Sequence, residues 1–443
     1  MRLGPGSPRL SGDRERTIAQ YALLTEAAPA AAASRSARHA AAAVWPGDTL
    51  IMPSLKANTS LALRRILNEE HLGCDVFGPG ELGLALRAGV TPEQISLNGS
   101  TKGDSLLATA VARDVRVTVD SLDELVRLRA VAGAAHARAA VRLRVRPWLP
   151  DSAAASDFTP NGDPAHVAVQ DYRAGIPDEH LDAALELAHR SPELELRGLM
   201  GHVSRQTTDL GFWRAHAREL GRHTVTACRR LAGWRPCEID VGGGFAPPRD
   251  PTGRGLPERA VAPYAPTPAA YAQALVEGLY EGLAGGSIRP EYVRLELEPG
   301  RAVYANAGLY LTRVLHVKRQ RRPLARSWVE TDTSEAFLAD LLWEHSRFRT
   351  VIANDVERPP GGLAAITGIS CGFDVLDPMD RRPEATPGDV LAFLDTGAYQ
   401  DATSSNFNAM PRPATVLVRG EEARVIKRAE TIDDLLAREV VGP

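Results

Sequence analysis

Short apolar or β-branched runs alternate with amphipathic segments between residue 48 and about residue 300. Eight of these runs have the length and composition of buried strands: Thr49–Met52, Cys74–Phe77, Ile95–Asn98, Arg116–Asp120, Ala140–Val145, Leu196–His202, Glu238–Val241 and Val293–Glu298. Apolar residues at helical spacing lie between most of them, in Leu61–Asn68, Glu81–Ala88, Leu122–Ala132, His180–His189, Phe212–Leu231 and Pro268–Ala284. Eight strand–helix units over roughly 250 residues match a (β/α)8 barrel. We predict this barrel over residues 47–302 and prefer it to a doubly wound sheet, because eight regular repeats favour closure.

The pattern changes after residue 302. Strand-like runs are now separated by turn residues such as Pro359–Gly362 and Pro387–Asp389. The runs are Leu309–Val317, Trp328–Thr331, Ala364–Ile369, Val390–Leu394, Ala414–Val418 and Ala423–Lys427. Helical patterns are limited to Ser334–His345 and Ile432–Val441. Residues 303–443 are therefore predicted to form a mainly antiparallel β domain.

The first 46 residues form an arm rich in Ala, Arg, Ser and Pro. The arm lacks the continuous apolar core of a secretory signal, and Asp13, Glu15 and Glu26 are unusual for an organelle transit peptide. We expect residues 1–15 to be disordered and residues 16–45 to be helical. The arm is expected to pack on the β domain.

Bulk composition limits the classes of partner. The 443 residues are 44% hydrophobic and 24% charged, with a net charge of −3, as in an ordinary globular protein. This balance gives no electrostatic reason to expect nucleic acid or an anionic membrane as a partner, and no apolar run approaches the roughly 20 residues of a membrane span. The four cysteines are scattered without metal-binding spacing. We therefore expect no metal site and a reducing, cytoplasmic location.

Candidate chemistry collects where the predicted barrel strands end. These positions hold Lys56, Asp75, Asn98, Asp120, His202, Gly242–Gly244 and Glu298. The carboxyl ends of the strands carry the active site in barrels of this type. Each residue also has a structural interpretation: Asp75 and Asp120 suit helix caps, His202 suits a buried core position, and three glycines suit a plain turn.

Their combination is more specific than any single residue. A strand-end lysine such as Lys56 can form a Schiff base. Gly242–Gly244 lack side chains where backbone amides could approach a phosphate. Glu298 and Arg301 add a carboxylate and a cation at the same edge. Pyridoxal phosphate carries an aldehyde, a phosphate and a pyridine nitrogen that need such different partners, so the sequence predicts a pocket for this cofactor.

The chain resembles the fold-III pyridoxal-phosphate decarboxylases, the ornithine and diaminopimelate decarboxylase family, over residues 45–420. The matching segments stand in the family's order and span both predicted domains. They are Pro53–Asn58, Cys74–Val76 with Gly80–Leu82, Val119–Ser121 with Glu124–Leu125, Gly201–Val203, Asp240–Phe245, Glu298–Arg301, Gly368–Cys371, Gly388–Val390, Thr396–Tyr399 and Asn406–Asn408.

The resemblance implies roles for individual residues. Lys56 is the Schiff-base lysine, His202 stacks on the cofactor ring, and Glu298 faces the pyridine nitrogen and keeps it protonated. Residues implied to hold the phosphate or line the cofactor pocket are Asp75, Glu81, Gly242, Gly243, Gly244, Gly300, Arg301 and Tyr399. Cys371 is implied to protonate Cα in the active site of a partner subunit, which predicts a homodimer with shared active sites.

Two departures concern the end of the substrate away from Cα. The family's cysteine is usually followed by an acidic residue that reaches this distal end, whereas Gly372 follows Cys371 and the nearest acid is Asp374. The family's small phosphate ligand after the histidine is replaced by an arginine. Arg205 suits either the cofactor phosphate or a substrate carboxylate.

A third departure lies in residues 332–345. Diaminopimelate decarboxylases carry an arginine for the distal carboxylate there, and Asp340 occupies that position in an ungapped alignment. The run that ends at Glu344 is closer to the ornithine type, in which an acid binds a distal amine. Glu344 also fits a solvated helix position. These features favour a substrate with a basic distal group over diaminopimelate, and Arg205 keeps an acidic or conjugated substrate open.

The predicted function is α-decarboxylation of an amino acid. Two alternatives stay open on the same barrel: an amino-acid racemase, and a regulatory relative without catalysis. Racemases of this fold tend to place arginine against the pyridine nitrogen, where this chain has Glu298. The presence of Lys56, His202 and Cys371 argues against an inactive relative.

Overall fold

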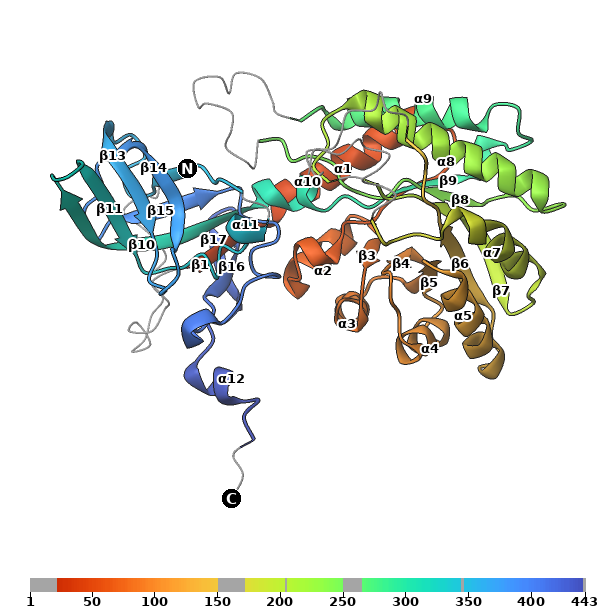
Figure 1. Cartoon of the computed structure of the whole chain (residues 1–443), viewed down its shortest axis with the longest axis horizontal. Coiled ribbons are helices and arrows are strands. Elements are labelled where there is room, and N and C mark those ends of the chain that lie inside the picture. The colour runs from red at the N-terminus through yellow and green to blue at the C-terminus, as the bar shows by residue number, and fades with distance from the viewer. Residues whose placement is uncertain (1–21, 150–171, 204, 250–264, 344–345, 441–443) are drawn as a thin grey trace. The chain divides into compact units, whose positions relative to one another are not determined.

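The computed structural model describes residues 22–149, 172–203, 205–249, 265–343 and 346–440. The chain forms two compact units (Figure 1). The barrel unit comprises residues 31–248 and 263–303, and the β unit comprises residues 1–30, 249–262 and 304–443. The expected disorder of residues 1–15 lies outside the described residues.

The barrel unit is built on eight parallel strands. They are β2 (Thr49–Ile51), β3 (Cys74–Val76), β4 (Ile95–Leu97), β5 (Arg116–Val119), β6 (Ala139–Arg144), β7 (Leu194–Met200), β8 (Glu238–Asp240) and β9 (Arg294–Leu297). Their order is β2-β9-β8-β7-β6-β5-β4-β3. The ring closes where the Gly73 amide donates to the Ile51 carbonyl at 3.0 Å and Ser54 bridges Asp75. The predicted barrel and its eight strands are confirmed.

Helices follow most of the barrel strands and surround them (Figure 1). They are α2 (Leu61–Glu69), α3 (Pro79–Ala88), α4 (Asp104–Ala112), α5 (Leu122–Ala134), α7 (Asp178–Arg190), α8 (Leu210–Arg230) and α9 (Pro268–Leu283). Serine caps fix where two of them begin: Ser60 Oγ accepts the Leu63 amide, and Ser121 Oγ accepts the Glu124 amide, each at 3.2 Å. These caps fix the ends of the loops after β2 and β5, and the loop after β2 carries Lys56.

The β unit contains a sheet of nine strands. They are β1 (Ala22–Glu26), β10 (Gly308–Gln320), β11 (Arg326–Thr331), β12 (Thr350–Ile352), β13 (Pro360–Thr367), β14 (Val375–Pro383), β15 (Val390–Leu394), β16 (Ala414–Arg419) and β17 (Glu422–Lys427). The β1–β16 and β11–β13 pairs are parallel and the other pairs are antiparallel. Its core includes Tyr310, Phe337 and Phe393. The predicted mainly antiparallel domain is confirmed.

Three helical expectations need correction. Residues 22–26 form β1, which lies between β10 and β16, and the helix α1 covers only Ala27–Val44. The expected helix over Ser334–His345 is reduced to α11 (Asp340–Trp343) among the described residues. The last helix, α12, covers Ile432–Leu436. In the first case the hydrogen-bonding edges of two distant strands outweigh the local helical preference.

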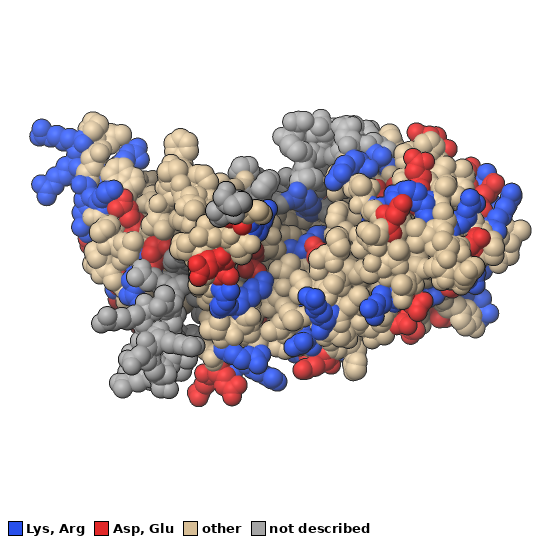
Figure 2. Space-filling view, turned by 90° about the horizontal axis from the view of Figure 1, so that it is seen from below, with Lys and Arg blue, Asp and Glu red and all other residues tan. Residues whose placement is uncertain are grey.

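Charged side chains of both signs are interspersed over the face shown in Figure 2. Among the described residues, the structure contains no helix with the length and apolar character needed to cross a membrane.

Candidate active site

Lys56 lies just beyond β2, in a short 3₁₀ turn over Leu55–Ala57. Its Nζ donates to Asp75 Oδ2 at 2.6 Å. Asp75, on β3, also accepts from Ser54 Oγ at 2.6 Å and from Asn98 Nδ2 at 2.7 Å. Burial by itself would raise the pKa of Asp75, but the Lys56 charge and these hydrogen bonds outweigh it, so the net pKa is lowered. Asp75 is therefore held as a carboxylate, and it positions the Lys56 amine at this edge of the barrel.

Glu298 follows β9 and is buried at the same edge of the barrel. Its Oε1 accepts from Asn98 Nδ2 at 2.7 Å and from Ser96 Oγ at 2.9 Å. Burial raises the pKa of Glu298 well above its usual range, the charges of Asp240 and Asp75 add to this, and Arg142 and Lys56 oppose it. Asn98 links the two ends of the arrangement, because the same amide nitrogen contacts Asp75 and Glu298.

The glycine triplet has a steric reason in the barrel. A Cβ on Gly243 would lie 2.1 Å from the Glu298 carbonyl oxygen, and a Cβ on Gly242 would lie 2.8 Å from the Gly201 carbonyl oxygen. Gly242 and Gly244 also have positive φ angles of 71° and 108°. The triplet is thus required where the ends of β7, β8 and β9 approach each other, and it leaves backbone that lacks side chains at the functional edge.

His202 is oriented by this triplet. The Gly243 amide donates to His202 Nδ1 at 3.0 Å, which places any ring proton of the neutral imidazole on Nε2. Burial lowers the pKa of His202 well below its usual value, and the charges of Arg144 and Lys56 lower it further. The ring is therefore neutral at physiological pH and suited to pack against a flat aromatic group.

The predicted site residues divide between the two units. Lys56, Asp75, Glu81, His202, Arg205, Gly242–Gly244, Glu298, Gly300 and Arg301 belong to the barrel unit, and Asp340, Cys371, Asp374 and Tyr399 belong to the β unit. Glu344 lies outside the described residues. Around the barrel edge, the structure brings Lys56 to Asp75 and His202 to Gly243. The functional roles assigned to these residues stay predictions.

Cys371 lies in the loop between β13 and β14 and is exposed. Asn408 clamps it: the Cys371 amide donates to Asn408 Oδ1 at 2.9 Å, and Asn408 Nδ2 contacts Cys371 Sγ at 3.3 Å. Asp374 is buried in the same loop, where it accepts the amides of Ser370 at 2.6 Å and Glu335 at 2.7 Å. Asp374 therefore fixes the loop that presents Cys371.

Two other predicted substrate ligands also have protein partners. Asp340 is buried and accepts from Ser346 Oγ at 2.6 Å. Arg205 is partly buried in a segment that ends at Thr207, whose carbonyl accepts from Tyr271 Oη at 2.9 Å and from Trp213 Nε1 at 3.1 Å. These two donors hold the backbone beside Arg205.

Ser96, Arg142 and Asp240 were not predicted as site residues, and Asn98 was predicted only as a strand-end candidate without a role. Each of them contacts Glu298 or the glycine triplet. The available signal was the alternation of polar residues along β4, β6 and β8, because every second side chain of a barrel strand points inward.

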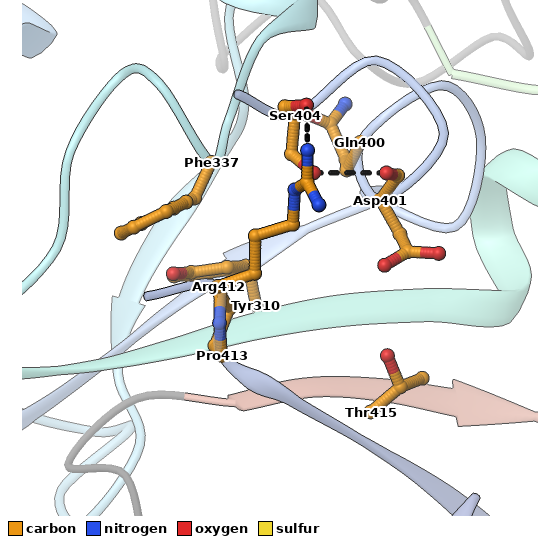
Figure 3. A pocket seen from close by; sticks show the side chains of 8 residues that line it. All are labelled: Tyr310, Phe337, Gln400, Asp401, Ser404, Arg412, Pro413 and Thr415. Carbon is orange, nitrogen blue, oxygen red and sulfur yellow. Dashed lines mark hydrogen bonds between the residues drawn. The ribbon is translucent and has the colours of Figure 1, made fainter. Parts of the chain in front are cut away.

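A small cavity inside the β unit is a separate feature (Figure 3). It has a volume of about 10 Å³, which suits roughly one water molecule. Its lining consists of Tyr310, Phe337, Gln400, Asp401, Ser404, Arg412, Pro413 and Thr415. Arg412 closes one side by donating to the Ser404 carbonyl at 3.3 Å. The cavity is too small for a cofactor or an amino acid.

Comparison with known proteins agrees with the barrel site. Residues 33–305 match the family described as pyridoxal-dependent decarboxylase, pyridoxal binding domain. The chain belongs to this family. Its relatives include diaminopimelate decarboxylases of Archaeoglobus fulgidus, 30% identical over 88% of this chain and 86% of the relative, and of Actinosynnema pretiosum, 33% identical over 85% and 80%. These matches confirm the predicted cofactor and activity: the chain is a pyridoxal-phosphate-dependent amino-acid decarboxylase.

Solved structures show the same fold. Diaminopimelate decarboxylase of M. jannaschii has a TM-score of 0.83 at 23% identity, and the alignment covers 95% of this chain and 92% of that one. The lysine/ornithine decarboxylase of Vibrio vulnificus has a TM-score of 0.71 at 20% identity, and its alignment covers 91% of this chain and 95% of that one. The family's two-domain fold therefore extends over both units of this chain.

The barrel edge fits pyridoxal phosphate. The glycine backbone leaves room that a Cβ would fill, and a lysine amine and a buried carboxylate lie at the two ends of the Asp75–Asn98–Glu298 chain. Bound there, the cofactor supplies an electron-withdrawing ring. Lys56 would be the amine for its aldehyde, and Glu298 would be the carboxylate for its ring nitrogen.

Proposed function

We propose that this decarboxylase acts on diaminopimelate, an amino acid with both an amine and a carboxylate at its distal end. The observation that carries the proposal is the set of relatives named diaminopimelate decarboxylase, which align with 85–90% of the chain. Agreement over both units favours a shared substrate more than agreement over the cofactor barrel alone, because the proposed Cys371 loop lies in the β unit.

The roles that we propose for the barrel residues follow from their contacts. Lys56 binds the cofactor covalently, and Asp75 takes part in moving the proton of its amine. The Glu298 carboxylate stabilises a proton on the ring nitrogen, and neutral His202 packs on the ring. The phosphate is held by Gly242–Gly244 with Gly300, Arg301 and Tyr399. Cys371 delivers a proton to Cα after carbon dioxide leaves.

A second candidate substrate is an amino acid with only a basic distal group, such as ornithine, lysine or arginine. It is favoured by Gly372, which stands where the family has an acid, and by Asp340, which stands where diaminopimelate decarboxylases have arginine. Asp340 and Asp374 are, however, both buried and bonded to protein donors. These two carboxylates therefore do not distinguish diaminopimelate from the basic amino acids. Glu344 and Arg205 are the side chains that we propose for distal recognition.

The substrate is tested with purified protein loaded with pyridoxal phosphate. We expect carbon dioxide release from diaminopimelate with a kcat/KM at least about tenfold above that for ornithine, lysine or arginine, which corresponds to about 1.4 kcal/mol of transition-state binding. An Arg205→Met variant should reduce this preference if Arg205 contacts the distal carboxylate. Faster turnover of a basic amino acid would replace the first candidate with the second.

We also propose a homodimer in which Cys371 completes the partner's active site. The support is the apolar surface around Cys371 in the β unit. Phe373 is 98% exposed, and Ile369 and Val375, close to it in sequence, are also exposed. Phe407 is exposed next to Asn408, the residue that bonds the Cys371 amide. A surface of this kind is typical of a protein–protein contact.

Shared sites make a specific prediction for mixed dimers. Lys56→Ala and Cys371→Ala should each lose most activity when expressed alone, because each lacks one essential group in every site. Co-expression should restore about a quarter of wild-type activity, because about half of randomly paired dimers carry one intact site. Decarboxylation by the purified mixture is measured against each single variant. If the mixture stays as inactive as its components, Cys371 does not act in a partner's site.

We further propose a reducing compartment such as the cytoplasm. All four cysteines are free, and Cys237 and Cys371 are exposed. Exposed thiols persist where disulfide formation is disfavoured. Fractionation of cells that express the protein checks the location.

A further inference from the structure

A cluster of buried charges fills the barrel beneath the proposed cofactor site. We call it the ionic cluster; its members are Arg116, Arg142, Glu238, Asp240, Glu296 and Glu298, all fully or almost fully buried. They come from β5, β6, β8, β9 and the residue after β9. Buried charges are costly unless they are paired, so the arginines beside the four carboxylates decide their state. Arg197 and Arg294 also pair with the inner carboxylates Glu238 and Glu296, from partly exposed positions.

Arg142 spans two levels of this cluster. Its Nη1 contacts Glu296 and lies 3.9 Å from Glu238 Oε1. Its Nη2 lies 2.8 Å from Asp240 Oδ2 and 3.7 Å from Glu298 Oε1. One guanidinium therefore joins the inner pair, Glu238 and Glu296, to the pair at the functional edge, Asp240 and Glu298.

Arg116 pairs only with the inner carboxylates, Glu238 and Glu296, among the described residues. Its Nη1 lies 3.0 Å from Glu238 Oε2, and its Nη2 lies 2.9 Å from Glu296 Oε2. Among the described residues, these two carboxylates are its ion-pair partners. Arg116 is as deeply buried as Arg142 but does not reach the functional edge, which makes it a matched control.

The pair at the functional edge depends on the Arg142 charge. Burial raises the pKa of Asp240 and that of Glu298, and mutual repulsion raises the pKa of Glu298 further. Arg142 opposes the shift at both residues. The other charges that face them are Glu296 at Asp240, and Asp75 and Lys56 at Glu298. Two adjacent carboxylates without a cation tend to share one proton.

Asp240 and Glu298 are both connected to the cofactor edge. Asp240 Oδ1 accepts the Gly242 amide at 2.7 Å, and Glu298 Oε1 accepts from Asn98 at 2.7 Å. Arg142 Nη2 also donates to Ser96 Oγ, which in turn donates to Glu298 Oε1. Arg142 thus holds the first glycine of the cradle through Asp240 and the ring-facing carboxylate through Ser96.

We propose that Arg142 is a positioning residue that holds Asp240 and Glu298 in place beneath the cofactor and favours their charged forms. The proposal rests on the proposed role of Glu298. It assigns Arg142 no contact with cofactor or substrate. Loss of Arg142 leaves two buried carboxylates that take up a proton at a higher pH, and a neutral Glu298 no longer stabilises a protonated ring nitrogen.

The test compares Arg142→Met with Arg116→Met. Pyridoxal phosphate is titrated into each apoprotein between pH 6 and 9 and followed by its visible absorption, a readout that needs no substrate. We expect Arg142→Met to weaken cofactor binding at least tenfold at pH 7, with partial recovery toward pH 9. Arg116→Met should lose comparable thermal stability and keep the wild-type pH dependence of binding.

Conservative variants keep the test decisive if a methionine variant does not fold. Arg142→Lys retains a charge but cannot span both levels, so its pH dependence should shift toward higher pH by at least about half a unit, whereas Arg116→Lys should show no shift. Equal pH dependence in the Arg142 and Arg116 variants would overturn the proposal. Failure of the proposed substrate would appear separately, as wild-type protein that binds the cofactor normally but does not decarboxylate diaminopimelate.

Discussion

Replacing Lys56 with alanine is expected to abolish covalent cofactor attachment and to reduce decarboxylation by at least about 10³-fold. The physical reason is that Lys56 Nζ is the amine held at the barrel edge by Asp75, at 2.6 Å. Borohydride reduction of the wild-type holoenzyme should fix the cofactor on the protein. Peptide mapping should then find it on Lys56 among the four lysines of the chain.

Lys318→Ala is the matched control for a lysine outside the site. Lys318 lies on β10, and its side chain is exposed and paired with Glu330. This variant should keep the visible absorption, the reduced adduct and wild-type turnover. An adduct on Lys102, Lys318 or Lys427 instead of Lys56, or full activity of Lys56→Ala, would show that the anchor is misassigned.

Glu298→Gln is expected to separate activity from stability. Turnover should fall by at least about 10²-fold, because an amide cannot stabilise a proton on the ring nitrogen as a carboxylate does. The apoprotein should nevertheless become more stable. The pKa of Glu298 is raised in the folded state, so the folded protein loses stability as pH rises from the unfolded value near 4.5 through the folded value. Glutamine is neutral and avoids this loss.

The stability gain should therefore appear above the unfolded value near pH 4.5 and grow as pH rises, by on the order of 1 kcal/mol for each unit by which the pKa is raised. Chemical denaturation of the apoprotein at several pH values measures it. Glu296→Gln is the control, because burial is outweighed there by Arg116, Arg142 and Arg294 and the net pKa of Glu296 is lowered. That variant should be destabilised at neutral pH. A Glu298→Gln apoprotein that is less stable than wild type at pH 8 would contradict the assigned direction.

In the β unit, local sequence patterns failed to predict one strand and the start of another. β14 (Val375–Pro383) was not predicted, because Pro378 interrupts its pattern and proline is disfavoured inside strands. It is tolerated because β14 lies at the edge of the sheet beside β13. β13 itself begins at Pro360, within the segment interpreted as a turn. In each case the pairing partner, which a local pattern does not contain, decides the structure.

The sequence by itself determined the eight barrel strands and the positions of Lys56, His202, the glycine triplet and Glu298 at their ends, because strand length, helical spacing and order along the chain are local properties. Only the tertiary structure placed Arg142, Glu238 and Glu296 together. These residues are far apart in sequence, and their charges meet because β6, β7, β8 and β9 are neighbours in a closed sheet. Whether a buried carboxylate is raised or lowered in pKa depends on which arginine it then meets, and this is a property of the folded barrel alone.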